Sequence, residues 1–258
     1  MKTQIINPPE EKTLGMAKNV MMTNRNLLIV STSKIHGSGY MEYIQDQVAE
    51  HFKNCKKVTF IPFARPGGIS HDEYTKIASD AFDKIGVEVR GAHTFESARE
   101  AVNWADGLFT GGGNTFVLLT QLYKLGFIEH IKSAVESGKP YMGSSAGSNI
   151  TGITISTTND MPIMYPPTFE ALQLVPFNIN PHYLDPDPGS KHMGETRETR
   201  IKEFHAYNDQ PVVGLREGSA LIVKGNDIKI FGDHSVRIFE KGKQPYEIES
   251  TENLNFLV

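Results

Sequence analysis

From Asn26 onward, short apolar runs rich in branched residues alternate with longer polar stretches that have the period of a helix. This alternation is typical of strand–helix–strand units around a parallel sheet, because strands buried on both faces read as continuous apolar runs. We therefore predict an α/β fold with a mostly parallel sheet. The predicted strands are NLLIVST (26–32), KVTFIPFA (57–64), VEVRGAHTF (87–95), GLFTGGG (107–113) and KPYMGSSA (139–146).

The polar stretches between these runs predict helices. Gly86, Gly126 and Gly138 lie where helices are expected to end, because glycine readily adopts the left-handed backbone found there. The predicted helices cover residues 40–52, 71–85, 97–105 and 114–138, and a later helix covers residues 194–207.

The last quarter of the chain, residues 212–242, has a different pattern. Its short alternating strands are separated by Gly-Asn and Gly-Asp turns at residues 225–226 and 232–233. Turns of this kind favour hairpins, so the pattern predicts C-terminal antiparallel strands, arranged as a meander that closes the same domain.

Residues 1–25 are mostly polar and show no sustained period, which predicts a loosely ordered N-terminal extension. The chain has 258 residues, 39% of them hydrophobic, and can bury a sizeable core. We expect residues 26–258 to form a single α/β domain.

Charge and cysteine content limit the partners and the compartment. The formal net charge is −4, without long runs of one sign, so no basic face for nucleic acid or an anionic membrane is expected. The partners should be small molecules or other proteins. Cys55 is the only cysteine, which excludes a disulfide framework and fits a buried thiol in a reducing cytoplasm. The sequence shows neither a membrane span nor a signal-peptide layout, so we predict a soluble, cytosolic protein.

The stretch Gly143-Ser144-Ser145-Ala146-Gly147 fits the pattern G-x-S-x-G between an apolar strand and a possible helix. A sharp turn in that context exposes the central hydroxyl as a nucleophile, here that of Ser145. Small residues can equally serve to start a helix close to a sheet, with Ser144 or Ser148 as its cap. The motif alone leaves both interpretations open.

A nucleophilic serine needs a base and an acid that orients it. His182, in NINPHYLDP, follows a short apolar segment at the point where α/β enzymes place their chemistry. The acid is either Asp160 in TTNDMPI or Glu217 in GLREGSALIV, and Glu217 is better placed because it follows a strand. Asp160 is more typical of a turn or a substrate-side residue. Each of these side chains could also be merely solvated.

The other eight histidines lie in polar helices or turns, and we expect most of them to be solvated. They are His36, His51, His71, His93, His130, His192, His205 and His234.

Residues 110–115, TGGGNT, end a strand and open a helix, so their backbone N–H groups should point into the crevice. With the N–H of Ala146 they could stabilise an oxyanion. A nucleotide site is disfavoured because neither G-x-G-x-x-G nor G-x-x-x-x-G-K-[ST] is present.

The ordered set GGGNTF, GSSAGSN, TTNDMPI, INPHY, GETRETRI and GLREG resembles the peptidase E family, the serine α-aspartyl dipeptidases. The resemblance runs from about Asn26 to the final strands. It implies a fold like that of class I glutamine amidotransferases, with helices on both faces of the sheet and a nucleophile elbow. It also implies cleavage of dipeptides with an N-terminal aspartate, without a metal or cofactor.

The resemblance assigns roles to five residues. It implies Ser145 as nucleophile, His182 as base, Glu217 as acid, Gly113 as an oxyanion donor and Arg197 as the reader of the substrate aspartate. Arg197 suits that role, since a guanidinium can hold a carboxylate through two parallel hydrogen bonds. The alternative is an exposed helix arginine paired with a neighbouring glutamate. Asp160 is a reserve candidate, for the acid or for binding the free amine of the substrate.

The sequence departs from the family pattern at Ser144, where a tryptophan commonly precedes the nucleophile. The smaller side chain could widen the site or change its water access, and the DPDPGS stretch (185–190) could reshape a loop over it. Two alternatives stay open: a related peptidase for other aspartyl peptides, such as β-linked ones, and a non-catalytic member that binds an aspartyl or amino-acid ligand. A glutamine amidotransferase is disfavoured because that chemistry needs a cysteine at the elbow, and Cys55 lies far upstream.

Overall fold

The computed structural model describes residues 24–186, 189 and 194–258. Most of the predicted N-terminal extension, part of the DPDPGS stretch and His192 lie outside the described residues. Arg25, at the end of the predicted extension, is buried, and its guanidinium donates to the carbonyl oxygens of Leu174 at 2.6 Å and Gly225 at 3.1 Å.

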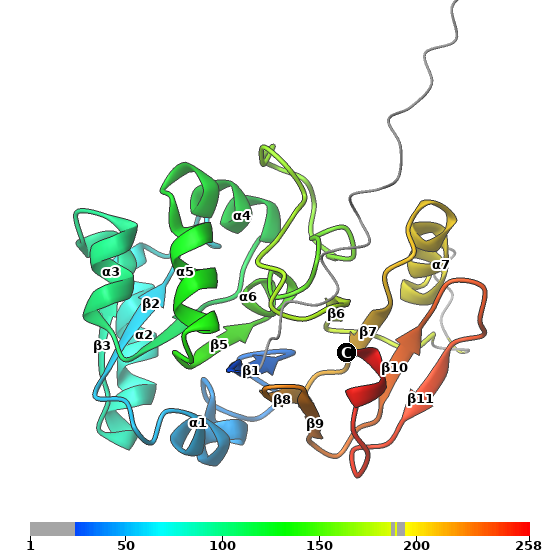
Figure 1. Cartoon of the computed structure of the whole chain (residues 1–258), viewed down its shortest axis with the longest axis horizontal. Helices are drawn as coiled ribbons and strands as arrows, with labels where there is room; N and C mark the ends of the chain where they lie inside the picture. Colours follow the sequence, from blue (N-terminus) through cyan, green and yellow to red (C-terminus); the bar gives the residue numbers. More distant parts are fainter. Residues whose placement is uncertain (1–23, 187–188, 190–193) are drawn as a thin grey trace, which may run out of the picture.

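The main sheet contains all five predicted parallel strands (Figure 1). Its order is β3-β2-β4-β5-β1-β8-β9, in which the first five strands are parallel and the last two are antiparallel. The predicted mostly parallel α/β fold is therefore confirmed. The bounds are β1 Asn26–Val30, β2 Lys57–Ile61, β3 Glu88–Gly91, β4 Gly107–Thr110, β5 Tyr141–Ser144, β8 Ala220–Lys224 and β9 Asp227–Phe231.

Helices cover both faces of this sheet, because the central strands are apolar on both sides. Leu27 and Ile29 of β1 face one core, while Leu28 and Val30 face the other, as the alternation of side chains along a strand requires. Residues of α3, α4, α5 and α6 join the first core, and residues of α1 and α2 join the second. The bounds are α1 Gln45–His51, α2 His71–Phe82, α3 Ala98–Trp104, α4 Thr115–Lys124, α5 Phe127–Glu136 and α6 Ala146–Asn149.

Glycines end helices where they were expected to. Gly86, Gly126 and Gly138 have φ of 72°, 75° and 93°. Gly126 divides the predicted 114–138 helix into α4 and α5, because its left-handed backbone breaks the helical path. The predicted 194–207 helix is α7, Arg197–Tyr207, which begins later because the Thr196 side chain caps it. Short 3₁₀ helices cover Glu42–Ile44, Asp83–Ile85, Ala92–Thr94 and Asn255–Leu257.

The predicted C-terminal meander is split between two sheets. β8 and β9 extend the main sheet, whereas β10 (Val236–Phe239) joins β6 (Asn178–Pro181), β7 (Val212–Leu215) and β11 (Tyr246–Ile248) in the order β11-β10-β7-β6. Gly232, with φ of 109°, lets the chain turn from one sheet to the other. The second sheet also contains a parallel pair, β6 and β7. The C-terminal strands pair antiparallel as β8–β9, β7–β10 and β10–β11, and β8 is also antiparallel to β1.

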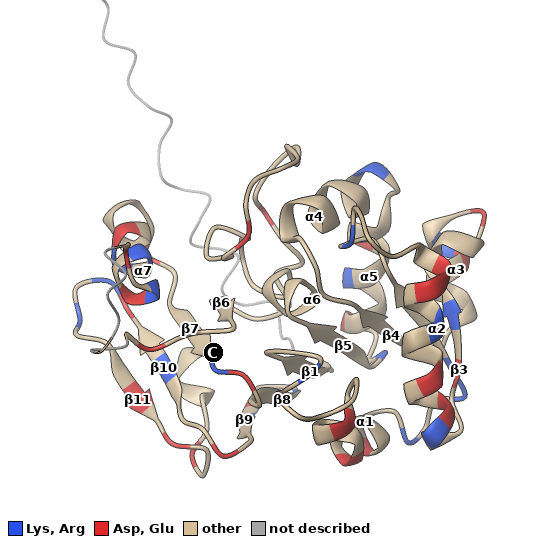
Figure 2. Cartoon of the chain, turned by 180° about the vertical axis from the view of Figure 1, so that it is seen from behind, with Lys and Arg blue, Asp and Glu red and all other residues tan. Residues whose placement is uncertain are grey.

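Charges of both signs are interspersed over the outer helices (Figure 2). Within the described part of the chain, no helix combines the length and apolar character needed to cross a membrane. Cys55 is buried, as predicted, and burial raises the pKa of its thiol to about 11.

Candidate active site

Ser145 lies in a sharp turn between β5 and α6. Its φ of 54° and ψ of −110° are unusual for a residue with a side chain, and its amide donates to the Val30 carbonyl oxygen at 3.1 Å. Strained backbone of this kind costs ~1–3 kcal/mol and persists only where the surroundings impose it. The turn therefore has the geometry of a nucleophile elbow.

The turn needs glycine at both ends of the motif, because neighbouring backbone atoms leave no room for a side chain there. A Cβ on Gly143 would overlap the Gly147 carbonyl oxygen, and a Cβ on Gly147 would overlap the Thr110 carbonyl oxygen. Bulkier residues at either position would therefore collide with the adjoining strand and helix.

The interpretation of the serines as helix caps is wrong. The N-cap residue of α6 is Ser145, and its side chain makes no capping hydrogen bond. The Ser148 hydroxyl instead donates to the Val30 carbonyl oxygen at 2.6 Å, and the buried Ser144 hydroxyl has no partner among the described residues. Ser144 is 0% exposed, so its own hydroxyl does not face the solvent.

His182 lies between Ser145 and Glu217. Its Nε2 is 2.9 Å from Ser145 Oγ, and its Nδ1 is 2.7 Å from Glu217 Oε1. In the tautomer that carries its proton on Nδ1, this nitrogen donates to the carboxylate and Nε2 can accept from the serine hydroxyl. This is the protonation state in which a histidine can take a proton from a serine.

The ends of β6 and β7 bring His182 and Glu217 together. These strands are parallel, with Pro181 opposite Leu215, so the residues that follow both strands meet at one edge of the sheet. His182 is itself strained, with φ of 53°, and its amide donates to Ser31 Oγ at 2.9 Å.

Asp160 makes different contacts. Its Oδ2 accepts from the Thr115 amide and hydroxyl, both at 2.7 Å, and from the Thr158 hydroxyl at 3.1 Å. A carboxylate at the N-terminus of α4 is favourably placed for the helix dipole. Glu217 rather than Asp160 is thus the carboxylate hydrogen-bonded to His182.

The two expected oxyanion donors flank the serine. Ala146 is the first residue of α6, where an amide lacks a partner within the helix, and Gly113 precedes the Asn114 cap of α4 with φ of 143°. A Cβ on Gly112 would lie 2.9 Å from Ser145 Cβ, so the glycine loop passes directly beside the serine.

A cavity of about 500 Å³ adjoins this group and is lined by His182, Glu217, Arg197, Arg216 and His234, among others. Arg216 is held by Asp185, through two hydrogen bonds of 2.8 Å, and by Glu247. Arg197 is half-buried and forms no ion pair with any described residue, and burial lowers the pKa of its guanidinium. Arg197 therefore does not pair with a neighbouring glutamate: Glu195 pairs with Arg200, and Glu198 with Lys202 and Arg237.

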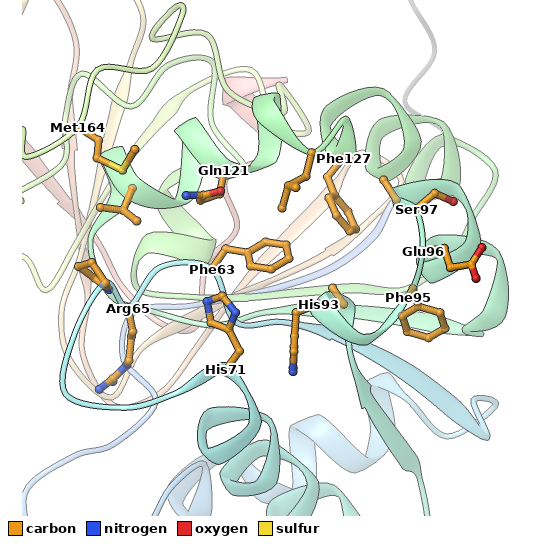
Figure 3. Close-up of a pocket in the computed structure, with 15 residues that line it drawn as sticks. Phe63, Arg65, His71, His93, Phe95, Glu96, Ser97, Gln121, Phe127 and Met164 are labelled. Atoms are coloured by element: carbon orange, nitrogen blue, oxygen red, sulfur yellow. The ribbon is translucent and has the colours of Figure 1, made fainter.

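Another cavity of about 500 Å³ lies among η4 (Ala92–Thr94), α4 and α5 (Figure 3). Phe63 packs against Phe127 and His71 there, with ring centroids 5.6 and 5.4 Å apart. Ser145 lines neither cavity, but His182 and Glu217 line the first and not this one, so we place the candidate active site beside the first cavity.

Two histidines expected to be solvated are not: His205 is buried and His51 is partly buried. His51 Nε2 is 3.1 Å from the Tyr141 carbonyl oxygen, and burial lowers the pKa of His51 to about 4. His205 is 8% exposed, and its Nε2 lies 3.0 Å from the Gln210 carbonyl oxygen. Tertiary packing rather than the polar sequence around them decides their environment.

Comparisons with known proteins identify the family. The sequence model described as Peptidase family S51 matches residues 27–231. The chain belongs to this family. It is 46% identical over 241 residues to a Drosophila melanogaster protein named "Probable alpha-aspartyl dipeptidase", with 92% of this chain and 99% of that protein covered. It is also 46% identical over 233 residues to Peptidase E of Streptomyces coelicolor, covering 90% and 95% of the two chains.

The solved structure of a peptidase from an acI-B1 Actinobacterium supports the fold of this S51 chain. It is 17% identical, with a TM-score of 0.66, and the match covers 91% of this chain and 98% of that one.

Two residues beside the site of this S51 chain were given no role by the sequence: Ser31 lies outside the motifs, and Asn159 lies within TTNDMPI. Ser31 bonds to the His182 amide, and the Asn159 side chain donates to the Pro181 carbonyl oxygen at 2.8 Å. A polar residue directly after a central apolar strand was the only available signal for Ser31. Within the described residues, no group of three or more His, Cys, Asp or Glu side chains could hold a metal ion.

Proposed function

We propose that this protein is a serine peptidase that hydrolyses dipeptides with an N-terminal aspartate, with Ser145, His182 and Glu217 as its catalytic triad. The observation that carries the proposal is the position of His182 between the other two residues. Its Nε2 lies 2.9 Å from the hydroxyl of Ser145, a residue with strained backbone, and its Nδ1 lies 2.7 Å from the Glu217 carboxylate. The family, and the names of the relatives, support the substrate class.

In the proposed reaction, Ser145 Oγ attacks the peptide carbonyl carbon while His182 Nε2 takes the hydroxyl proton. His182 then gives this proton to the leaving nitrogen, so the C–N bond breaks and an aspartyl ester forms on Ser145. Water, deprotonated by His182, attacks the ester. His182 then returns this proton to Ser145 Oγ as the C–O bond breaks and aspartate leaves. Glu217 holds the imidazole and stabilises its charged form throughout.

The amides of Gly113 and Ala146 would stabilise the negative oxygen of both tetrahedral intermediates. Such donors act because they are fixed before the charge develops, and the loss of one typically costs ~10²–10³ in rate. The sharp turn at Ser145 supports this role for Ala146, whose amide follows the nucleophile directly.

Arg197 would bind the aspartyl side chain of the substrate. It lines the cavity beside His182, and none of the described carboxylates neutralises it through an ion pair. The charge of Asp160 acts on Arg197, which supports a position for Asp160 near the same substrate, where it could match the free amine. We propose a cytoplasmic enzyme that acts on small peptides without a cofactor.

Hydrolysis of Asp-Leu, Asn-Leu, Glu-Leu, Ala-Leu and isoaspartyl-leucine by the purified protein tests this proposal. We expect cleavage of Asp-Leu alone, none in Ser145→Ala, and loss of the preference for Asp-Leu over Asn-Leu in Arg197→Met. Cleavage of isoaspartyl-leucine alone would contradict the proposed substrate class and indicate β-linked aspartyl peptides instead. Equal binding of Asp-Leu by wild type and Ser145→Ala, with no cleavage, would contradict catalysis and indicate a ligand-binding member of the family.

A further inference from the structure

Ser31 directly follows β1, the strand beside β5 in the main sheet, and is 0% exposed. Its hydroxyl makes two hydrogen bonds: it accepts from the His182 amide at 2.9 Å and donates to the Leu215 carbonyl oxygen at 2.8 Å. One hydroxyl therefore joins the segment that carries the proposed base to the segment that carries the proposed acid.

The backbone of Ser31 anchors the other end of the acid segment. Its amide donates to the Ser219 carbonyl oxygen at 3.0 Å. Leu215 and Ser219 lie two residues before and two residues after Glu217, so both ends of the turn around Glu217 are bonded to Ser31.

The preceding residue, Val30, holds the serine turn. Its carbonyl oxygen accepts from the Ser145 amide at 3.1 Å and from the Ser148 hydroxyl at 2.6 Å. Two consecutive residues at the end of one strand thus contact all three segments of the proposed triad.

We propose that Ser31 is a positioning residue that sets the distance between His182 and Ser145, an inference that rests on the proposed function. His182 has strained backbone, which relaxes unless hydrogen bonds fix it. The neighbouring bond from the Tyr183 amide to the Leu215 carbonyl oxygen, 3.0 Å long, does not involve Ser31. Removal of the Ser31 hydroxyl therefore frees the His182 amide while the pairing of β6 and β7 remains.

Ser31→Ala tests this role through kcat for Asp-Leu and through the rate at which a fluorophosphonate labels Ser145. We expect both to fall about 10–100-fold, the effect of a displacement of about 1 Å, with KM unchanged. The labelling rate needs no dipeptide, so it separates positioning of the base from substrate binding.

Thr59→Val is the matched control. Thr59 is also 0% exposed, and its hydroxyl donates to the Ala101 carbonyl oxygen at 2.6 Å, on β2 rather than at the triad. Its loss should lower stability as Ser31→Ala does, but leave kcat and labelling unchanged. If Ser31→Ala does not fold, Ser31→Cys replaces it, since a thiol keeps a similar shape with weaker hydrogen bonds. Wild-type kcat and labelling in the folded variant would overturn the inference.

Correlation of imidazole protons and nitrogens by NMR separates this inference from the proposed function. We expect His182 in wild type to show the Nδ1–H tautomer alone, and Ser31→Ala to show a mixture of tautomers, whether or not any dipeptide is cleaved. An unchanged tautomer in Ser31→Ala would overturn the positioning role. Absence of Asp-Leu cleavage by wild type would instead overturn the proposed function.

Discussion

Two residues of the candidate site, Ser145 and His182, have positive φ, 54° and 53°, without being glycine. Each such position costs ~1–3 kcal/mol of backbone strain. Both are bonded through their amides to the end of β1, at the Val30 carbonyl oxygen and the Ser31 hydroxyl. Met41 and Gln173 also have positive φ, but only Ser145 and His182 combine it with side chains that meet at the candidate site, as expected of a site arranged before substrate binds.

Replacement of the two candidate acids distinguishes their roles at the residue scale. Glu217→Gln should lower kcat by about 10²–10⁴-fold, because the amide favours the wrong tautomer of His182. Asp160→Asn should leave fluorophosphonate labelling of Ser145 close to wild type, because Asp160 bonds to Thr115 and Thr158 instead. Rapid labelling in Glu217→Gln together with slow labelling in Asp160→Asn would reverse the assignment.

The sequence indicated both carboxylates and favoured Glu217, but could not place either beside His182. The choice depends on the parallel pairing of β6 and β7, which places the residue after Pro181 beside the turn after Leu215. That pairing joins segments more than thirty residues apart, so no local pattern reveals it.

Among the elements, the turn from β5 into α6 depends on close backbone packing. Gly147 lies so near the Thr110 carbonyl oxygen that even a methyl group has no room, and both partners are backbone atoms that cannot rotate away. The elbow and the neighbouring strand β4 are therefore fixed relative to each other.

Gly147→Ala should lower the free energy of unfolding by ~1–3 kcal/mol through overpacking, and should lower kcat as well. Gly67→Ala is the matched control, because a Cβ there meets nothing within 4 Å. Urea unfolding of both variants measures the difference. Equal stability of the two variants would show that the elbow tolerates a side chain, against the packing described here.

Most elements could be predicted from the sequence, because the parallel strands other than β3 are largely apolar and buried, and three glycines mark helix ends. The pairing of the last strands could not be predicted from the sequence. Alternating patterns identify β8 to β10 as strands, but the division between two sheets follows from the turn at Gly232 and from burial against different elements.

At the scale of the whole molecule, a titratable side chain, that of His51, lies where helix α1 contacts the main sheet. His51 of α1 lies with its Nε2 3.1 Å from the Tyr141 carbonyl oxygen of β5. Burial lowers its pKa from 6.5 to about 4, so the folded protein resists protonation there. Between pH 6.5 and pH 4 the unfolded chain binds a proton at His51 more readily than the folded protein does. The free energy of unfolding must therefore decrease as the pH falls through this window.

His51 should therefore cost the protein up to ~3 kcal/mol of stability as the pH falls from 6.5 to 4. His51→Gln should make this decline shallower, because glutamine does not titrate. The free energy of unfolding, measured in urea at several pH values, checks the slope. His36→Gln, at an exposed position, should leave the slope unchanged. The same slope in wild type and His51→Gln would contradict the burial of a neutral imidazole.

Reaction with a fluorophosphonate shows whether Ser145 is an activated nucleophile. Mass spectrometry of the intact protein and of its peptides counts and locates the adducts. We predict one adduct per chain, on the peptide that contains Ser145, formed quickly in wild type, slowly in His182→Gln and not in Ser145→Ala. No adduct in wild type, or an adduct on another residue that persists in Ser145→Ala, would contradict it.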